Sequence, residues 1–347
     1  MSETNSYAFD GAVNLEEFAF TDYMTSIAIG MFRNCAKVKS LTIPKNIQSI
    51  GFAAFYGCSG IETPIVIDNK LSSIGNYAFS GCSSIPSVTV LKTDCTFSER
   101  CFENCTSIKE VPSNIAAFSK GMFAGCTSIT SVDLSEKVES LGGGTFQNCS
   151  AIEKVTIRNK SMKFLNDGGD FVGCMNLKTA GPIPQSESDP SYDIEFAFDE
   201  EIPDNAFSFT GNPRSDPLVS IDIPSTVTRI GDRAFAYCMN LDSIELPDGV
   251  TSIGHDAFAQ CRNLVKITIP SKAHTIGSNA LFSCLGLDDV YLYPRTVDAA
   301  SKANDYSKSW FNGCSQSTTV HIPTDLVDDD AAQAAYGSYW NYIDETK

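Results

Sequence analysis

Histidine and tryptophan are scarce in this chain, and acidic residues outnumber basic ones. Only 3 of the 347 residues are histidine and 2 are tryptophan, and 42 aspartates and glutamates stand against 25 lysines and arginines. The net charge is −17 and the sequence pI is near 4.5. Nucleic acids and anionic membranes need a basic surface that displaces their counterions. The charge balance therefore argues against both as partners.

Long apolar runs are also missing. No stretch approaches the roughly 18 apolar residues of a membrane-spanning helix, so we expect no insertion into a bilayer. The first residues, MSETNSYAFDGAVNL, lack the basic and apolar regions of a secretory signal. The sequence thus leaves two options, an intracellular protein or a protein whose export segment lies outside these residues.

Motifs of catalysis and metal binding are not found. The three histidines, His255, His274 and His321, have no metal-ligand spacing, and there is no Walker loop, G-x-S-x-G turn or H-E-x-x-H motif. Zinc sites need paired cysteine clusters, whereas the 13 cysteines here recur mostly one at a time. We therefore predict no enzymatic activity, no cofactor and no metal site.

The cysteines follow a fixed interval. Successive spacings of 23, 24, 23, 21 and 23 residues separate Cys35, Cys58, Cys82, Cys105, Cys126 and Cys149. A second run, Cys238, Cys261 and Cys284, also has spacings of 23. A residue that returns once per interval behaves as a packing position, so we predict a ladder of free, buried thiols. Neighbouring Cα atoms one strand spacing apart would still lie within disulfide range.

A repeat of about 23 residues explains this interval. Residues 234–258, AFAYCMNLDSIELPDGVTSIGHDAF, follow the pattern A-F-x-x-C-x-x-L-x-x-I-x-L-P-x-x-V-x-x-I-G and end on the next Ala-Phe. Thirteen copies begin at Phe9, Phe32, Phe55, Phe79, Phe102, Phe123, Phe146, Phe171, Phe207, Phe235, Phe258, Leu281 and Phe311. One such unit cannot bury its own apolar side, so the pattern predicts a solenoid of stacked coils.

Each copy contains three predicted parts. L-x-x-I-x-I predicts a short strand with alternate residues pointing inward. The glycine of V-x-x-I-G would permit a sharp bend. The apolar residues of A-F-x-x-C, at i, i+1 and i+4, predict one helical or 3₁₀ turn.

This pattern resembles the BspA-like (treponemal type) leucine-rich repeat over roughly residues 8–323. The resemblance implies an α/β solenoid, wound as a right-handed coil, with a parallel sheet on the concave face and short strands or helical turns on the convex side. It also implies surface proteins of mucosal bacteria and parasitic protists that are associated with adhesion and with binding of host matrix proteins. Related repeats occur in phage as well.

Three intervals are longer than the repeat. They are 36 residues from Phe171 to Phe207, 28 from Phe207 to Phe235 and 30 from Leu281 to Phe311. We predict a solenoid over residues 1–323 with an acidic insertion at about 180–205 and a smaller one at about 294–308. Residues 324–347, which are acidic and then alanine-rich, would form a capping segment.

The acidic insertion is the first candidate binding region. It has no lysine or arginine between residues 185 and 204 and carries Glu187, Asp189, Asp193, Glu195, Asp199, Glu200 and Glu201. Such carboxylates could supply oxygen ligands to calcium, but the order of a calcium loop is missing. A solvated loop is the favoured interpretation.

The second candidate is a column of outward strand residues, one per copy. These are Thr42, Thr89, Asp133, Thr156, Asp222, Glu245, Thr268, Tyr291 and His321. They would line one face of the sheet, although threonine is also an ordinary exposed strand residue. The acidic and aromatic members favour the C-terminal half.

We therefore interpret the chain as a non-enzymatic protein-binding scaffold. The favoured prediction is an adhesin at the cell surface or outside the cell, which binds a host or partner protein through the concave sheet or the inserted loops. A structural or host-attachment component of a phage or another large assembly, and an intracellular interaction scaffold, are the alternatives.

Overall fold

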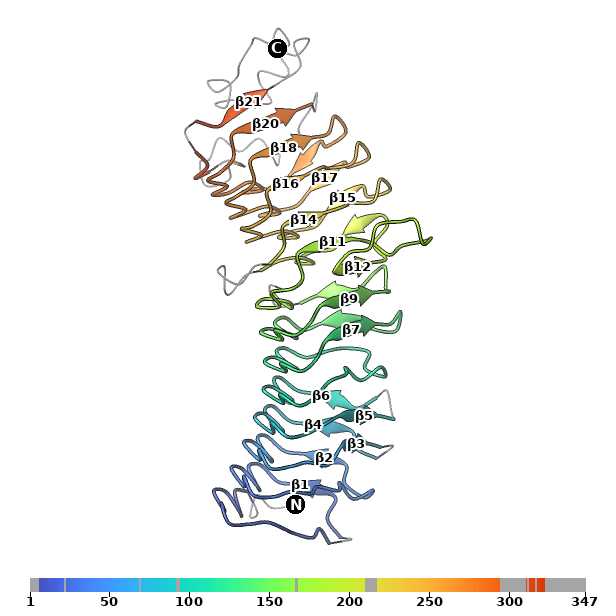
Figure 1. Ribbon diagram of the computed structural model, residues 1–347, viewed down its shortest axis with the longest axis vertical. Helices are drawn as coiled ribbons and strands as arrows, with labels where there is room; N and C mark the ends of the chain where they lie inside the picture. Colours follow the sequence, from blue (N-terminus) through green and yellow to red (C-terminus); the bar gives the residue numbers. More distant parts are fainter. Residues whose placement is uncertain are drawn as a thin grey trace. The chain divides into compact units, whose positions relative to one another are not determined.

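The computed structural model describes residues 6–21, 23–68, 70–91, 94–165, 168–209, 217–293, 310, 312–315 and 317–321 (Figure 1). The predicted capping segment at 324–347, the smaller insertion at 294–308 and the repeat residue Phe311 lie outside these ranges. The chain forms two compact units: unit 1 comprises residues 1–159 and 170–176, and unit 2 comprises residues 160–169 and 177–347.

Strands and turns account for all regular structure in the described residues. Those of unit 1 are β1 (Ser26–Ile27), β2 (Ser49–Ile50), β3 (Ile65–Ile67), β4 (Ser73–Ile74), β5 (Val88–Val90), β6 (Thr96–Phe97), β7 (Ser131–Leu134), β8 (Ser140–Leu141) and β9 (Lys154–Ile157). None of the described residues of either unit belongs to a helix. The described part of the chain therefore contains no helix that could cross a membrane.

Unit 2 repeats this organisation. Its strands are β10 (Lys163–Phe164), β11 (Thr179–Pro182), β12 (Ile194–Phe196), β13 (Glu201–Ile202), β14 (Ser220–Ile221), β15 (Arg229–Ile230), β16 (Ser243–Ile244), β17 (Ser252–Ile253), β18 (Lys266–Ile269), β19 (Thr275–Ile276), β20 (Asp289–Leu292) and β21 (Thr319–His321).

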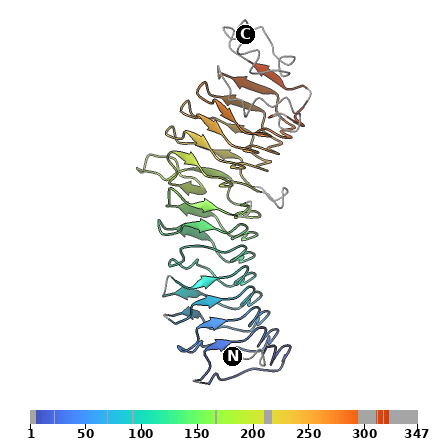
Figure 2. The ribbon, with the colours of Figure 1, turned by 180° about the vertical axis from the view of Figure 1, so that it is seen from behind.

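Successive coils pair their strands in parallel, which confirms the predicted solenoid. In unit 1 the order is β1-β2-β4-β6, beside the pairs β3-β5 and β7-β9; in unit 2 it is β13-β15-β17-β19 and β16-β18-β20-β21, with β14-β11-β12. Figure 2 shows the same stacking from behind. Equivalent residues face each other, as in Ile27 with Ile50 and Ile50 with Ile74. Parallel pairing of equivalent residues stacks their buried side chains into continuous rows.

The repeat phenylalanines form the clearest of these rows. In unit 1 the rings of Phe32, Phe55 and Phe79 are fully buried and stack with centroids 5.4 and 5.2 Å apart and interplanar angles of 5° and 7°. In unit 2, Phe235 and Phe258 stack at 5.3 Å and 5°. Aromatic rings at these separations add packing energy to their burial.

The cysteine ladder lies beside the phenylalanines, and it does more than fill space. Each ladder thiol donates to the carbonyl of the repeat phenylalanine, or of Leu281 in its place, one coil earlier, for example Cys58 Sγ to Phe32 O at 2.9 Å and Cys82 Sγ to Phe55 O at 3.0 Å. All 13 cysteines are free, and 12 are buried. Burial raises the pKa of the Cys58 and Cys149 thiols to about 12. Thiols of such high pKa stay protonated and unreactive.

The segment A-F-x-x-C is not the predicted helical turn. Alternate N–H groups bond three residues back, as from Ala54 to Gly51 O, and the others bond the next coil, as from Phe55 to Ala78 O at 2.8 Å. The residues two before Phe55 and two after it, Ala53 and Gly57, have φ angles of 49° and 71°. These left-handed residues redirect the N–H groups along the stack. The sequence spacing fits a helical turn equally well, so the pattern alone was misleading.

The glycine of V-x-x-I-G also has a different role from the one expected. Gly51 and Gly75 have no left-handed φ, so no special bend requires them. A Cβ at Gly75 would instead lie 2.7 Å from Phe52 N in the preceding coil. Glycine is needed there because adjacent backbones approach closely.

Candidate functional site

The predicted outward column exists in segments. Register places Asp133 opposite Thr156 on β7 and β9, and Thr268, Tyr291 and His321 side by side on β18, β20 and β21. Thr89 on β5 is exposed beside Val66 on β3. Thr42 is exposed too, but its segment forms no strand.

One member of the column is misplaced. Thr156 is buried rather than exposed, with 9% of its surface accessible. Its register partner Asp133 receives two hydrogen bonds from Arg158, at 2.7 and 2.8 Å, and Arg158 follows Thr156 by two residues on the same strand face. Thr156 therefore offers little surface to a partner, although strand alternation places it in the column.

In unit 2 the column becomes a cluster of aromatic and charged side chains. The rings of Tyr291 and His321 stack at 4.4 Å and 13°, and Lys266 Nζ lies 4.5 Å from the Tyr291 ring centroid. His321 Nε2 bonds Asp289 Oδ1 at 2.7 Å. Both the stacking and the cation–π contact hold Tyr291 in place at a partly exposed site. Sequence reasoning missed Lys266 and Asp289, although strand alternation puts each two residues before a column member.

Glu245 and Asp222 extend the acidic character of unit 2. Glu245 follows β16 and is exposed. Asp222 follows β14, and its Oδ2 accepts a hydrogen bond from Tyr192 Oη at 2.6 Å. Burial, reinforced by this bond to Asp222, raises the pKa of Tyr192 to about 12. We call Glu245, Lys266, Asp289, Tyr291 and His321 the unit 2 polar face.

The acidic insertion is not a simple solvated loop. It contains β12, which pairs in parallel with β11 and buries Ile194 and Phe196. The only buried acid of the set, Glu195, accepts a hydrogen bond from Ser191 Oγ at 3.1 Å. The run D-I-E-F-A-F does alternate apolar residues, so the strand was detectable in the sequence.

Most of the other acids in the insertion have separate local partners. Asp189 accepts from the backbone N–H groups of Gln185 and Ser186, which lower its pKa. Asp193 accepts from the N–H groups of Lys178 and Thr179, and Asp199 pairs with Lys160.

The insertion therefore offers no single cluster of carboxylates. Glu187 and Glu200 are exposed. Among the described residues, no group of three or more histidine, cysteine, aspartate or glutamate side chains is arranged to hold a metal ion.

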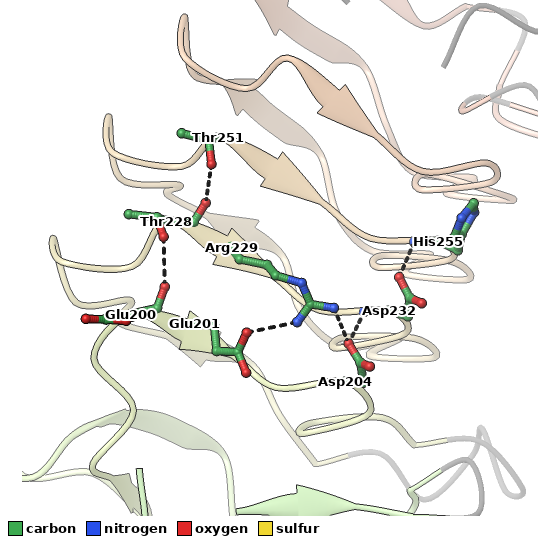
Figure 3. A network of polar contacts seen from close by, with 8 residues as sticks. All are labelled: Glu200, Glu201, Asp204, Thr228, Arg229, Asp232, Thr251 and His255. Atoms are coloured by element: carbon green, nitrogen blue, oxygen red, sulfur yellow. Dashed lines mark hydrogen bonds and ion pairs between the residues drawn. The ribbon is translucent and has the colours of Figure 1, made fainter. Parts of the chain in front are cut away.

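The end of the insertion joins a polar network on β13, β15 and β17, shown in Figure 3. Arg229 bonds both Glu201, at 3.1 Å, and Asp204, at 2.6 Å. Asp204 Oδ1 also accepts the Asp232 N–H, and Asp232 Oδ1 accepts the His255 N–H, each at 2.8 Å. Thr228 and Thr251 donate to the carbonyls of Glu200 and Thr228 one coil earlier.

These contacts give the network a structural role. The aspartates and threonines satisfy backbone groups in adjacent coils, and Arg229 joins two side chains of the preceding coil, so the coils are tied together outside the core. The polar network continues from His255 to the next coil, where the Ser278 N–H donates to His255 Nδ1 at 3.0 Å. His255 Nδ1 thus acts as a hydrogen-bond acceptor within the network.

The architecture defines the class of the protein as a solenoid built from short repeats with parallel strands. The model of the BspA type leucine rich repeat region matches residues 2–112, 62–178 and 200–331 in six copies, and the chain belongs to this family. No curated protein matches the chain.

Two solved structures resemble it over most of their length. A leucine-rich repeat protein from Bacteroides ovatus has a TM-score of 0.57 and 21% identity, covering 92% of this chain and 86% of that one. A leucine rich cell surface protein from Faecalibacterium prausnitzii has a TM-score of 0.50 and 21% identity, covering 96% and 90%. At this identity the likeness concerns the fold.

Proposed function

We propose that this protein is a non-enzymatic protein-binding scaffold that acts as an adhesin at the cell surface or outside the cell. Membership of a leucine-rich repeat family supports a scaffold, because stacked repeats present extended surfaces. One structural relative is described as a cell surface protein, which supports the location. The partner is a protein, such as a component of a host matrix.

The observation that carries the proposal is the unit 2 polar face. Its aromatic ring, that of Tyr291, contacts a lysine and a histidine, and the histidine bonds the carboxylate of Asp289. A tyrosine fixed in this way loses little side-chain entropy when a partner covers it, and tyrosine is enriched among residues that dominate binding energy. The exposed Glu245 adds a charge that selects a partner of opposite sign.

Binding to collagen I, to basement-membrane extract and to cultured epithelial cells tests this face. The double variant Glu245→Ala/Tyr291→Ala should bind at least about tenfold more weakly, since loss of an interface anchor costs 2 kcal/mol or more. The matched control Thr42→Ala/Thr89→Ala removes two exposed column residues of unit 1 and should bind as the parent does. Equal binding by parent and double variant contradicts the role of this face.

The location is tested separately. Protease treatment of intact source cells should degrade the protein while cytoplasmic markers survive. Survival of the protein until the cells are lysed would contradict an adhesin and favour an intracellular scaffold.

A further inference from the structure

A second exposed surface lies on the turns of the first coils of unit 1. Its members are Tyr7, Ile29, Phe52, Tyr56 and Tyr77, which we call the unit 1 apolar patch. Tyr7, Ile29, Phe52 and Tyr56 are 43%, 41%, 44% and 41% exposed. Large apolar side chains that gather at the surface in this way mark interaction sites.

The members of the patch lie in four successive coils, with Phe52 and Tyr56 in the same coil. Phe52 and Tyr77 pack edge to face with ring centroids 6.1 Å apart. The Tyr7 ring lies against Gly30, where an added Cβ would come within 2.3 Å of it. Ile29 lies in the coil between those of Tyr7 and Phe52. Hydrogen bonds from Tyr7 N to Ile29 O and from Gly30 N to Phe52 O join these three coils.

The fold does not require apolar residues in these slots. The position that Ile29 and Phe52 occupy, two residues after the inward strand isoleucine, holds Glu99 and Lys120 in later coils of unit 1. In unit 2 it holds Asp204, Asp232 and His255, with a similar path of the backbone. Because polar residues serve the same turn elsewhere, packing of the coil does not explain Ile29 and Phe52.

The patch is electrically neutral within a protein of charge −17. Arg33, beside the patch, lies 5.1 Å from the Tyr7 ring centroid and makes a two-point ion pair with Asp10 at 2.9 and 2.5 Å. A partner would therefore meet aromatic and aliphatic surface beside a compensated charge. Charge complementarity thus favours an uncharged apolar partner surface.

The size of the patch limits the partner. Aromatic side chains bury about 150–250 Å² each when fully covered, so five members less than half exposed offer roughly 400 Å². A stable interface needs about 800 Å² from each side. The patch is too small for a lasting dimer of this chain and suits a short segment held by a few anchoring side chains.

We propose that the unit 1 apolar patch is a docking site for a short, uncharged segment of another protein, anchored by two or three aliphatic or aromatic side chains. The site is separate from the unit 2 polar face, so either site can fail without the other.

A phage-displayed library of random dodecapeptides, panned on the immobilised full chain, supplies the probe. Enriched peptides should carry at least two aliphatic or aromatic residues and no net charge. Synthetic versions should bind Phe52→Ser at least tenfold more weakly than the parent, because Phe52 is central to the patch. Val66→Ser and Leu91→Ser, which remove exposed apolar residues of unit 1 outside the patch, should change binding less than twofold. Thermal unfolding of all variants checks that they are folded.

Several outcomes overturn the proposal. They are the absence of enriched peptides, enrichment of charged peptides, and equal loss of binding in Phe52→Ser and Val66→Ser. Loss of peptide binding in Tyr291→Ala would move the site to unit 2 and would overturn it also. A second copy of this chain is the other possible occupant of the patch, and sedimentation of the protein at 1–100 µM tests for it. Self-association that Phe52→Ser abolishes would identify that second copy as the occupant and would overturn the proposal.

Discussion

Asp170 is a buried carboxyl in a slot that alanine fills in other coils, as at Ala54 and Ala78. Its Oδ1 accepts the Thr145 N–H at 3.0 Å, while its Oδ2 is buried with no hydrogen-bond partner within the described structure. Burial raises the pKa of Asp170 to about 6 from an ordinary value of 3.8, against the lowering effect of Thr145. The charged form is therefore less stable in the folded protein than in the unfolded chain.

The pH dependence follows from this sign. Because the pKa of this carboxyl is higher in the folded protein than in the unfolded chain, protonation stabilises the fold. This stabilisation grows as pH falls from 6 toward 4 and is lost as pH rises through 6. A shift of about two units corresponds to roughly 3 kcal/mol. Asp170→Asn should therefore raise the free energy of unfolding at pH 8 by about 2 kcal/mol and by much less at pH 5. Urea titrations of parent and variant at pH 8, 7, 6 and 5 measure the difference.

An exposed acid of the same unit provides the control. Asp133→Asn removes a carboxylate from an ion pair with Arg158 whose side chains are 60% and 45% exposed, and such pairs contribute less than about 1 kcal/mol. Its difference from the parent should be small and nearly constant with pH. Parallel curves for Asp170→Asn and the parent would show that the buried carboxyl does not control this dependence.

At the scale of the element, the turn after each V-x-x-I-G segment depends on left-handed residues. In most coils the residue before the ladder cysteine is one of them, such as Gly57 before Cys58 and Gly81 before Cys82. At Gly81, with φ of 78°, an added Cβ would meet Gly57 backbone atoms no closer than 3.5 Å. Substitution there tests backbone conformation without a steric clash.

Gly81→Ala should destabilise the protein by about 1 kcal/mol, because a left-handed conformation costs an L-residue about 1–2 kcal/mol and the stiffer unfolded chain returns part of it. Gly249→Ala is the control, since Gly249 has no left-handed φ and its nearest atom is 3.4 Å from a built Cβ. It should be neutral or slightly stabilising. Chemical denaturation of both variants gives the comparison, and equal effects would contradict the role of φ.

The same turn shows how far sequence could predict the fold. The 23-residue interval placed Phe55 and Cys58 in the core, because apolar periodicity reports burial directly. It could not separate a helical turn from left-handed turns, since both bury the same side chains and differ in backbone φ. It also left the role of the Cys58 thiol as a donor unseen, because the acceptor is a main-chain oxygen.

Prediction of the site was weaker than prediction of the core. The outward column was derived from strand alternation, which assigns a side chain to one face of the sheet but does not report whether neighbouring residues cover it, and Thr156 is buried. The unit 1 apolar patch was missed because Ile29 and Phe52 occupy a position at which the repeat pattern specifies no residue type, so they do not depart from the pattern.

At the scale of the whole molecule, charge is divided unevenly. Unit 1 contains 16 acidic and 12 basic residues and has a net charge of −4. Unit 2 contains 26 acidic and 13 basic residues and has a net charge of −13. Self-repulsion of this kind destabilises a folded chain, and salt screens it over about 10 Å at 0.1 M. The excess charge should therefore make stability sensitive to ionic strength.

Raising NaCl from about 10 to 200 mM should increase the melting temperature by several degrees at pH 7.5. The increase should nearly vanish at a pH close to 4.5, where the net charge approaches zero. Differential scanning fluorimetry across this range measures both. A melting temperature that falls with salt would mean that ion pairs such as Arg229 with Glu201 outweigh the repulsion.

The forward hydrogen bonds of the turns give each stack a polarity. In the row from Tyr7 to Ile29, Gly30 to Phe52 and Ala53 to Asn76, every N–H points to the following coil and every carbonyl to the preceding one. Along the turn, one edge of such a stack presents oxygens and the opposite edge presents N–H groups. Two identical edges would oppose oxygen to oxygen or hydrogen to hydrogen, so turn-to-turn pairing of like ends is disfavoured. The polarity of the turn thus excludes pairing of like edges, whereas an oxygen edge and an N–H edge are complementary.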